Sequence, residues 1–574
     1  MLTQNIEVPT KKPRIFLPDN LVIDSWEKLA PYFDDLKDRT ISNVLELEKW
    51  MLDRSELEAV LEEDMAWRYI KMNIDTTDKS LEKEFMFFVQ EIEPKIAPYA
   101  NAYNKKLIEN EFVTELKGGG YDIYLRGVKK SIEIFREENI PLQTELQADA
   151  QKYGAISAQM SIEYDGKEMT LQQAAQYLKN TDRAVREDVY TKVASRRLKE
   201  VDALNNLYNE LIAKRTQVAK NAGFNNFRDY MFAAMGRFDY TANDCFDFHN
   251  AIAKEVVPAT SNFELERKQQ LGYDNLKPWD SDVDAEGKSP LKPFDNGATL
   301  LDKSITCFEK IHPYFGERLA IMKELGYLDL ESKKGKAPGG FNYPLHEIGV
   351  PFIYMNAVGS QRDLVTMVHE GGHAVHSFLT RDLKLTGFKE FPSEVAELAS
   401  MSMELISMDV WSEFYDNEDE LKRAKKEQLQ GVLKTLPWVA AIDKFQHWVY
   451  ENPTHTTEER DAKWNKIMDA FGSQHTNWEG NEAGRTNLWQ KQLHLFEVPF
   501  YYIEYGMAQL GAIAVWRNYK LNPKKAIEQY MDALSLGYTK NISEIYKTAG
   551  IEFNFSQAYV KELVDFVKEE LGKI

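Results

Sequence analysis

The residues of this sequence whose types and spacing are best suited to chemistry lie between positions 361 and 404. His369 and His373 frame a His-Glu-x-x-His pattern, with Glu370 directly after the first histidine. Positions four residues apart share one face of a helix, so the two imidazoles can converge on one metal ion while Glu370 lies beside them. Zinc prefers imidazole and carboxylate ligands, and a catalytic site keeps one position open for water. The pattern therefore predicts hydrolysis by a metal-activated water, with Glu370 as the general base.

The third protein ligand of such a metal must come from another part of the sequence. The metzincin pattern needs a histidine six residues after His373, but Leu379 occupies that position, so this class is excluded. His376 shares a helical face with His369. It lies too far along the helix axis to bind the same ion comfortably, and we interpret it as a neighbour of the site or a core residue.

A second predicted helix, which begins near Pro392 or Ser393, offers carboxylates. Glu397 lies in it among apolar residues, where a charged side chain needs a cation, so we predict that it is the third zinc ligand. Glu394 falls in the first turn, where the helix dipole alone explains a carboxylate. Glu404 lies seven residues after Glu397 on the same face, and it could either orient a ligand histidine or be solvated.

Two consecutive glycines, Gly371 and Gly372, stand inside the predicted metal-binding helix. Each costs about 1 kcal/mol relative to alanine, which makes sense if backbone or substrate must approach closely there. Two histidines and a glutamate in an apolar helix are also costly unless something satisfies them. The alternative to a metal site is a helix with two core histidines that are satisfied by ordinary hydrogen bonds.

The segment from His369 to His376 (HEGGHAVH), followed by Glu397 in VAELAS, resembles the oligoendopeptidase F and thimet oligopeptidase family of zinc metallopeptidases. Three other segments resemble the same family: 215–230, 276–280 with its Trp-Asp pair, and the tyrosine-rich 498–505. Residues 190–570 look familial, and the N-terminal third is compatible but less diagnostic. The sequence departs from the family at Gly371, where many members carry a bulkier residue. We expect this departure to alter packing rather than ligation.

One histidine and several tyrosines cluster near the C-terminus: His494, Tyr501, Tyr502 and Tyr505. Peptide hydrolysis requires donors aimed at the developing oxyanion, and phenols and imidazoles donate without adding negative charge. By the resemblance, one tyrosine stabilises the oxyanion, and another, or His494, holds the substrate. Tyr502 and Tyr505 share a helical face, and we predict Tyr505 for the oxyanion, with Tyr501 on another face; the family's spacing leaves the choice between Tyr501 and Tyr502 open. The alternative is an aromatic stripe that serves as core.

The elements that must position these residues are predicted to be mostly α-helical. Apolar residues recur every three or four positions, with charges between them. The stretches with this pattern are 26–61, 80–115, 120–137, 171–220 and 421–450. A single long helix is expected near 183–220, ending at Asn221-Ala222-Gly223.

Three places interrupt the predicted helices. Residues 157–170 alternate in short runs around Asp165-Gly166, which is a strong hairpin signal. Residues 272–298 hold several Gly, Pro and Asp and are expected to form a surface loop. The apolar segment 350–358 is rich in β-branched and aromatic residues and predicts a strand just before the metal-binding helix.

A boundary near the hairpin divides the chain into two predicted regions. Residues 1–170 are expected to form an N-terminal helical region that serves as a channel wall, and residues 171–574 a zinc metallopeptidase catalytic region. The family resemblance implies a helical ellipsoid with a deep central active-site channel and a small β element before the zinc-binding helix.

Composition and charge narrow the function classes. The chain has 574 residues and a net charge of −20, which argues against nucleic acid or an anionic membrane as the main partner. It has two cysteines, no apolar signal core in its first twenty residues and no apolar run of the roughly 18 residues that a membrane helix needs. We therefore expect a soluble, cytoplasmic protein. Short peptides as its substrates are what the family resemblance implies, and the oligomeric state is left open.

We interpret the sequence as a zinc-dependent oligopeptidase that hydrolyses internal peptide bonds and carries one zinc ion per chain. His369, His373 and Glu397 are the predicted ligands and Glu370 the predicted base. One alternative is a zinc exopeptidase, of the dipeptidyl carboxypeptidase or carboxypeptidase kind. The other is an inactive helical peptide-binding protein, although such a protein has no need for a general base.

Overall fold

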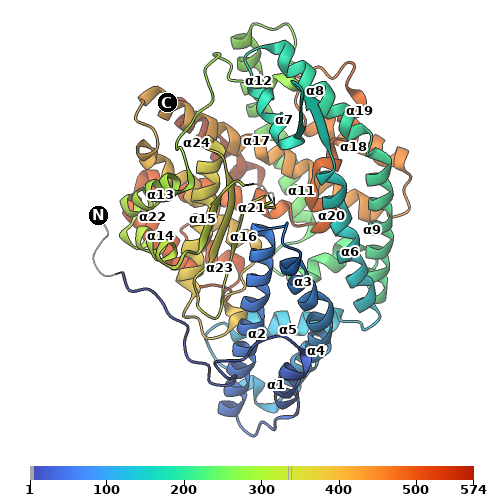
Figure 1. Cartoon of the computed structure of the whole chain (residues 1–574), viewed down its shortest axis with the longest axis vertical. Helices are drawn as coiled ribbons and strands as arrows, with labels where there is room; N and C mark the ends of the chain where they lie inside the picture. Colours follow the sequence, from blue (N-terminus) through green and yellow to red (C-terminus); the bar gives the residue numbers. More distant parts are fainter. Residues whose placement is uncertain (1–5, 334, 338) are drawn as a thin grey trace. The chain divides into compact units, whose positions relative to one another are not determined.

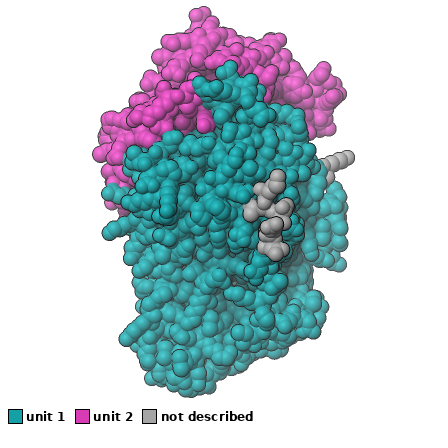
Figure 2. All heavy atoms as spheres, turned by 90° about the vertical axis from the view of Figure 1, so that its left-hand side faces the viewer, with its two compact units in different colours: residues 1–135, 291–424, 508–553 teal, residues 136–290, 425–507, 554–574 magenta. Residues whose placement is uncertain are grey.

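The computed structural model describes residues 6–333, 335–337 and 339–574, and helices dominate it (Figure 1). Its contacts divide the chain into two compact units, which Figure 2 distinguishes by colour. Unit 1 comprises residues 1–135, 291–424 and 508–553, and unit 2 comprises residues 136–290, 425–507 and 554–574. Each unit is therefore assembled from segments that are far apart in the sequence.

The helices within the described parts of unit 1 are α1 (Trp26–Asp38), α2 (Val44–Ile74), α3 (Lys79–Phe87), α4 (Glu93–Glu109), α5 (Tyr121–Ile134), α13 (Gly297–Ile311), α14 (Pro313–Leu325), α15 (Gln361–Thr380), α16 (Ser393–Ser407), α22 (Pro523–Ser535) and α23 (Ile542–Thr548). Those of unit 2 are α6 (Asn139–Ala158), α7 (Leu171–Ala175), α8 (Arg183–Leu198), α9 (Val201–Asn221), α10 (Phe227–Ala234), α11 (Ala242–Ala251), α12 (Val257–Leu271), α18 (Thr457–Phe471), α19 (Glu482–Thr486), α20 (Leu493–Glu497) and α24 (Gln557–Leu571). Two helices have residues in both units, α17 (Glu418–Glu451) and α21 (Ile503–Leu521).

The N-terminal helices of unit 1 pack around an apolar core that also includes Leu385 and Phe388. The helical stretch predicted over 26–61 falls on two of them, because α1 ends at Asp38 and α2 begins at Val44. Asn43 caps the second helix by accepting a hydrogen bond from the Glu46 backbone N–H at 3.0 Å. The helical periodicity is thus confirmed, and a local cap divides it.

The single long helix predicted near 183–220 is wrong, since the structure has two helices there. α8 ends at Leu198 and α9 begins at Val201. Between them, the Glu200 backbone N–H donates to the Arg197 carbonyl at 3.0 Å, a tighter turn than the α-helix allows. The charged pattern continues through both helices, so periodicity does not reveal the break.

Turn chemistry is the most reliable local signal in unit 2. The predicted hairpin is confirmed, with β1 (Ser161–Tyr164) pairing antiparallel to β2 (Lys167–Thr170). Asp165 and Gly166 both have positive φ, 50° and 69°, as the favoured two-residue hairpin turn requires. The predicted end of α9 is also confirmed, since Gly223 just beyond it has a φ of 87°.

The segment 272–298 is irregular, as expected, but part of it is buried rather than on the surface. It contains one turn of 3₁₀ helix, Pro278–Asp280. Asp280 is buried and pairs with Arg183 at 2.6 Å and with Arg186 at 2.8 Å. A high content of Gly, Pro and Asp indicates irregular backbone. It does not reveal which aspartate of the segment is buried and paired with arginine.

A small three-stranded sheet precedes α15 in unit 1. The strand order is β3 (Leu328–Glu331), β5 (Phe352–Ala357), β4 (Phe341–Tyr343), with β5 parallel to β3 and antiparallel to β4. β5 lies within the strand predicted over 350–358. It is buried at nearly every position because it is the central strand and packs against α15. The predicted strand before the metal-binding helix is therefore confirmed.

A capping box closes the turn between β5 and α15. The Ser360 hydroxyl accepts a hydrogen bond from the Asp363 backbone N–H at 3.3 Å, and Asp363 Oδ2 accepts one from the Ser360 backbone N–H at 2.9 Å. These reciprocal bonds start the helix at Gln361. His369 and His373 consequently lie well inside the helix, away from the ends that fray.

The mostly α-helical fold with a small β element is confirmed. The compact units do not coincide with the regions predicted over 1–170 and 171–574, because each unit combines segments from both. As regions of separate function they stay a prediction. None of the helices in the described part of the chain combines the length and the apolar character that crossing a membrane requires.

Candidate active site

Glycines in α15 allow two neighbouring helices of unit 1 to come close. A Cβ atom on Gly372 would lie 2.7 Å from Ser400 Cα and 2.8 Å from the Ala399 carbonyl oxygen, both on α16. The absent side chain therefore permits the close backbone approach that the sequence predicted. A Cβ atom on Gly371 would lie 2.5 Å from Phe308 Cζ of α13, so an aromatic ring fills the space beside it.

The contact between α15 and α16 brings the three predicted ligands together. One ligand atom from each of His369, His373 and Glu397 lies within 4.8 Å of the other two. Glu397 Oε2 is 3.4 Å from His369 Nε2 and 3.7 Å from His373 Nε2. Ligand atoms around tetrahedral zinc lie roughly 3.3–3.5 Å apart, given bonds of about 2.0–2.2 Å. The two imidazoles and the carboxylate therefore fit a zinc ion.

The same group is open on one side. The side chains of His369 and His373 are 20% and 19% exposed, whereas that of Glu397 is 6% exposed. A catalytic zinc site has three protein ligands and leaves a position for water or substrate, while a structural site is closed by four. The partial exposure of the histidines agrees with the catalytic kind.

The charges of the group already favour a cation. Burial alone would lower the pKa of His369, but the carboxylates of Glu397 and Glu404 raise it well above its usual value. Burial alone would raise the pKa of Glu397, but a hydrogen bond with His369 and the nearby His373 lower it to about 2. Burial lowers the pKa of His373 to about 4, so this imidazole is in the neutral form that binds metal. The two carboxylates thus stabilise a positive charge at the place where a metal would supply one.

Glu404 on α16 holds the ring of His369 in position. Its Oε1 lies 2.7 Å from His369 Nδ1, and its side chain is 12% exposed. A hydrogen bond at Nδ1 leaves Nε2 available as a metal ligand. The sequence left open whether Glu404 orients a histidine or is solvated, and the structure decides for the orienting contact.

Glu370 has its carboxyl in a buried environment. The residue is 6% exposed, and its Oε2 makes no hydrogen bond to a described residue. Burial is the main cause that raises the pKa of Glu370 to about 7, a value suited to taking up and releasing a proton near neutral pH. Asn342 on β4 donates to the Glu370 carbonyl oxygen at 3.2 Å, a contact that no pattern in the sequence indicates.

Two residues that the sequence analysis set apart from the ligands lie elsewhere. His376 is buried and stacks on Phe391 with ring centroids 3.6 Å apart. Burial lowers the pKa of His376 to about 3, so of the two interpretations the structure favours a core residue. Glu394 lies in the first turn of α16 and is not among the grouped ligand atoms found in the described part of the chain.

The tyrosine candidates belong to unit 2 and surround His494. Their ring centroids lie 6.0 Å (Tyr501), 4.9 Å (Tyr502) and 5.8 Å (Tyr505) from that of the histidine. All four side chains are partly exposed, so they do not form a buried aromatic stripe. Burial still raises the pKa of Tyr502 to about 12, which keeps its hydroxyl protonated and able to donate.

The prediction that Tyr501 points to another face is wrong. Its ring centroid lies 5.4 Å from that of Tyr505, as close as the 5.5 Å between Tyr502 and Tyr505. α21 begins only at Ile503, so helical periodicity does not apply to the two tyrosines before it. Phe500 turns the chain just ahead of them with a φ of 68°, a conformation that bulky residues rarely adopt.

Sequence models of known families match most of the chain. Residues 176–565 match the sequence model of peptidase family M3, and residues 20–135 match the peptidase M3 N-terminal domain. Among curated proteins, an oligoendopeptidase F homolog of Borreliella burgdorferi is 22% identical over 414 residues, which are 69% of this chain and 67% of that protein. Oligopeptidase PepF of Bacillus subtilis is 23% identical over 277 residues, so this match spans 46% of this chain and only 40% of the relative.

Solved structures resemble the chain over nearly its whole length. PZ peptidase A with an inhibitor has a TM-score of 0.90 at 26% identity, covering 97% of this chain and 98% of its own. A protein described as a putative oligoendopeptidase F has a TM-score of 0.89 at 26% identity, covering 98% of both chains. The likeness thus extends to the N-terminal third, where the sequence is less diagnostic.

Proposed function

Since this chain belongs to peptidase family M3, we propose that it is a zinc-dependent oligopeptidase that hydrolyses internal bonds of short peptides. The family makes it a metallopeptidase, a hydrolase that acts on peptides. The observation that carries the finer proposal is the convergence of His369, His373 and Glu397 on α15 and α16, next to the buried Glu370. Family M3 enzymes are generally zinc-dependent, and this donor set suits zinc.

We assign the catalytic zinc ion to His369, His373 and Glu397. When bound, zinc polarises the scissile carbonyl and lowers the pKa of a water towards neutrality. The protein's own part is to hold the ligands in place. Glu404 keeps Nε2 of His369 turned towards the site, and Ser400 donates a hydrogen bond to Glu397 Oε2 at 3.0 Å. Such supporting contacts set the orientation and basicity of the ligands.

Glu370 moves the proton in this proposal. Its Oε2 accepts a proton from the attacking water and then delivers it to the amine nitrogen that leaves, so the carboxylate is regenerated in each cycle. In the metal-free protein burial raises the pKa of Glu370 to about 7, which favours the uptake of a proton. Oε2 is buried and receives no hydrogen bond from a described residue, so no protein donor holds the carboxyl in its charged form.

The tyrosine cluster supplies hydrogen-bond donors to the reacting peptide in this proposal. Tyr505 donates to the oxyanion, and Tyr502 and His494 hold the substrate backbone. Their partial exposure and their mutual contacts support a binding role, because buried phenols of a packed core would be closed to substrate.

A peptide blocked at both ends tests the proposal. Internal cleavage should occur without a free terminus, disappear with a chelator and return with added zinc, as followed by mass spectrometry of the products. A dipeptidyl carboxypeptidase or a carboxypeptidase would leave the blocked peptide intact and cleave the unblocked one. A binding protein without activity would cleave neither, and either of these results would overturn the proposal.

Several narrower expectations accompany this function. The preference for short peptides rests on the central channel that the family resemblance implies, and the channel and the ellipsoidal shape stay predictions. The cytoplasmic location and the expectation of no nucleic-acid or membrane partner rest on the acidic composition and the two cysteines, and they stay predictions as well.

A further inference from the structure

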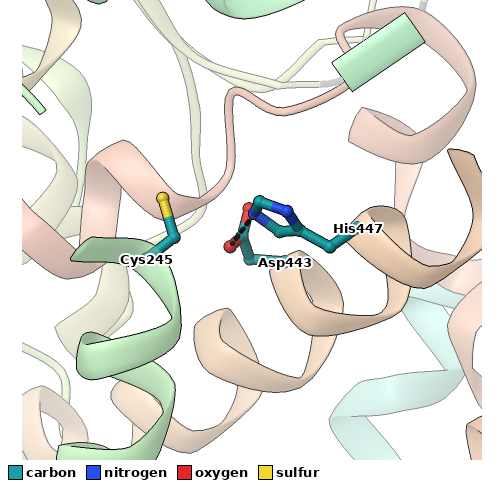
Figure 3. A group of neighbouring side chains, drawn as sticks. All are labelled: Cys245, Asp443 and His447. Carbon is teal, nitrogen blue, oxygen red and sulfur yellow. Dashed lines mark ion pairs between the residues drawn. The ribbon is translucent and has the colours of Figure 1, made fainter. Parts of the chain in front are cut away.

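Four side chains with metal-binding atoms meet inside unit 2, far along the sequence from His369. Cys245 and His249 lie four residues apart on α11, and Asp443 and His447 lie four residues apart on α17. Positions with this spacing share one face of a helix, so each helix presents one pair of side chains to the other. Figure 3 shows Cys245 on one helix facing Asp443 and His447 on the second. All four side chains are buried.

Three of these side chains lie within reach of a single ion. Cys245 Sγ, a carboxylate oxygen of Asp443 and a ring nitrogen of His447 all lie within 4.8 Å of one another. Asp443 Oδ2 is 3.2 Å from His447 Nε2 and 2.7 Å from His249 Nε2. Ligand atoms around a zinc ion with one thiolate lie roughly 3.3–3.5 Å apart, given Zn–N bonds of about 2.0 Å and a Zn–S bond of about 2.3 Å. Small side-chain rotations would close the difference.

Several buried polar atoms of the group have no partner that accounts for their burial. Asp443 Oδ1 and His447 Nδ1 are buried and make no hydrogen bond to a described residue. His447 Nε2 lies 3.2 Å from Asp443 Oδ2, at ion-pair distance, so the atoms left without a contact are Asp443 Oδ1 and His447 Nδ1. Buried polar atoms are nearly always satisfied in folded proteins, so this arrangement calls for a shared cation. The positions of the four residues on two facing helices make that cation a bridge between α11 and α17.

We propose that Cys245, Asp443 and His447 form a second metal site, which binds a divalent transition-metal ion such as Zn²⁺ and has a structural role. A thiolate, an imidazole and a carboxylate are donors that zinc accepts, whereas magnesium and calcium prefer oxygen alone. The thiolate and the carboxylate neutralise the dication, so the filled site is uncharged in the protein interior. His249 Nε2 lies 2.7 Å from Asp443 Oδ2 and holds the carboxylate in position.

Cobalt substitution tests this site directly, because a bond between cobalt and a thiolate gives a charge-transfer band in the near ultraviolet. The ligands assigned to the catalytic site are imidazoles and a carboxylate, which give no such band. The full-length protein is produced in medium in which Co²⁺ replaces zinc, so that a buried site is filled during folding. The wild type should show the band and about two metal ions per chain.

The two cysteines of the chain provide a matched pair of variants. Cys245→Ser should lose the band and one ion, whereas Cys307→Ser, at a buried cysteine on α13 of unit 1, should keep both. His373→Ala, which removes a catalytic ligand, should lose one ion and keep the band. This last variant separates a failure of the second site from a failure of the proposed function.

Two results would overturn the proposal. One is wild-type protein with no thiolate band, and the other is a band that survives in Cys245→Ser. In either case the group is a buried polar cluster of His249, Asp443 and His447, with Cys245 as an ordinary core residue. Should Cys245→Ser fail to fold, His447→Gln is measured instead, and it should lose the band while its thiol remains.

Discussion

Glu370 combines burial with a carboxyl oxygen that no described residue engages. Replacing it by glutamine keeps the volume and leaves all three assigned ligands in place. Glu370→Gln should therefore retain zinc but lose turnover by about 100- to 10,000-fold, since the amide does not accept the proton of water. Metal content and kcat on the same preparation check this. Near-normal kcat with zinc bound would show that the base is another residue.

Glu397 and Glu394 lie one turn apart on α16 and differ in what they face. Glu397 approaches both histidines, whereas Glu394 occupies the first turn and is outside the ligand group. Glu397→Ala should sharply lower zinc occupancy, and Glu394→Ala, the matched control, should leave it nearly unchanged. Metal analysis after dialysis distinguishes the two. Equal loss in both variants, or loss only in Glu394→Ala, would move the third ligand.

Tyr505 and Tyr502 differ in their assigned contacts with the substrate. Tyr505→Phe removes one hydroxyl and almost no volume, so zinc content and thermal stability should hold. If Tyr505 donates to the oxyanion, kcat and kcat/KM should fall together by roughly 100- to 1,000-fold. Tyr502→Phe should mainly raise KM. Wild-type kinetics in both variants would place the oxyanion donor outside this cluster. Tyr501 also lies in the cluster, and the kinetics of Tyr501→Phe show whether its hydroxyl contributes.

Two glycines of α15 differ in what they contact where this helix crosses its neighbours: one contacts backbone and the other contacts a side chain. Gly372 faces Ser400 and Ala399 of α16, whereas Gly371 faces the ring of Phe308, which can move. Gly372→Ala should therefore push the helices apart, lower zinc occupancy and reduce the free energy of unfolding by about 1–3 kcal/mol.

Gly371→Ala is the control for this crossing. It should cost less stability and leave zinc occupancy close to that of the wild type, because an aromatic ring yields more easily than a helix backbone. Thermal unfolding and metal analysis of both variants measure the difference. A larger loss of zinc in Gly371→Ala than in Gly372→Ala would contradict the account of the crossing.

The free energy of unfolding of the whole molecule should depend on pH because Glu370 has a buried carboxyl. The pKa of Glu370 rises from its ordinary 4.5 to about 7 in the metal-free protein. Between these pH values the folded state keeps a proton that the unfolded state has lost, so stability falls as pH rises. The contribution is on the order of 1.4 kcal/mol for each pH unit crossed.

Glu370→Gln lacks this titration and provides the comparison. Relative to the metal-free wild type, its free energy of unfolding should rise as pH increases from about 4.5 to about 7 and level off above that range. Urea unfolding of chelated protein at several pH values measures the difference. Two curves that run parallel through this window would mean that Glu370 titrates normally.

Features encoded within a few residues were open to prediction from the sequence alone. The turn at Asp165-Gly166, the strand within 350–358 and the helix that begins at Ser393 follow from turn chemistry, from β-branched and aromatic content, and from the proline just before the helix. The four-residue spacing of His369 and His373 is by itself enough to place both imidazoles on one face of a helix. Such features depend on interactions between residues that are close together in the sequence. These interactions are the same wherever the helix, strand or turn lies in the fold.

Features that join distant segments were decided only by the tertiary structure. Glu404 holds His369, Asn342 binds the Glu370 carbonyl and Phe308 fills the space at Gly371, and each of these contacts spans tens of residues. The prediction for Tyr501 is wrong because the helix starts after it. The group around Asp443 joins helices nearly two hundred residues apart, and no local pattern signals it. The spacing of residues in the sequence specifies which side chains share a face of a helix. Which other segments contact that face depends on the tertiary packing.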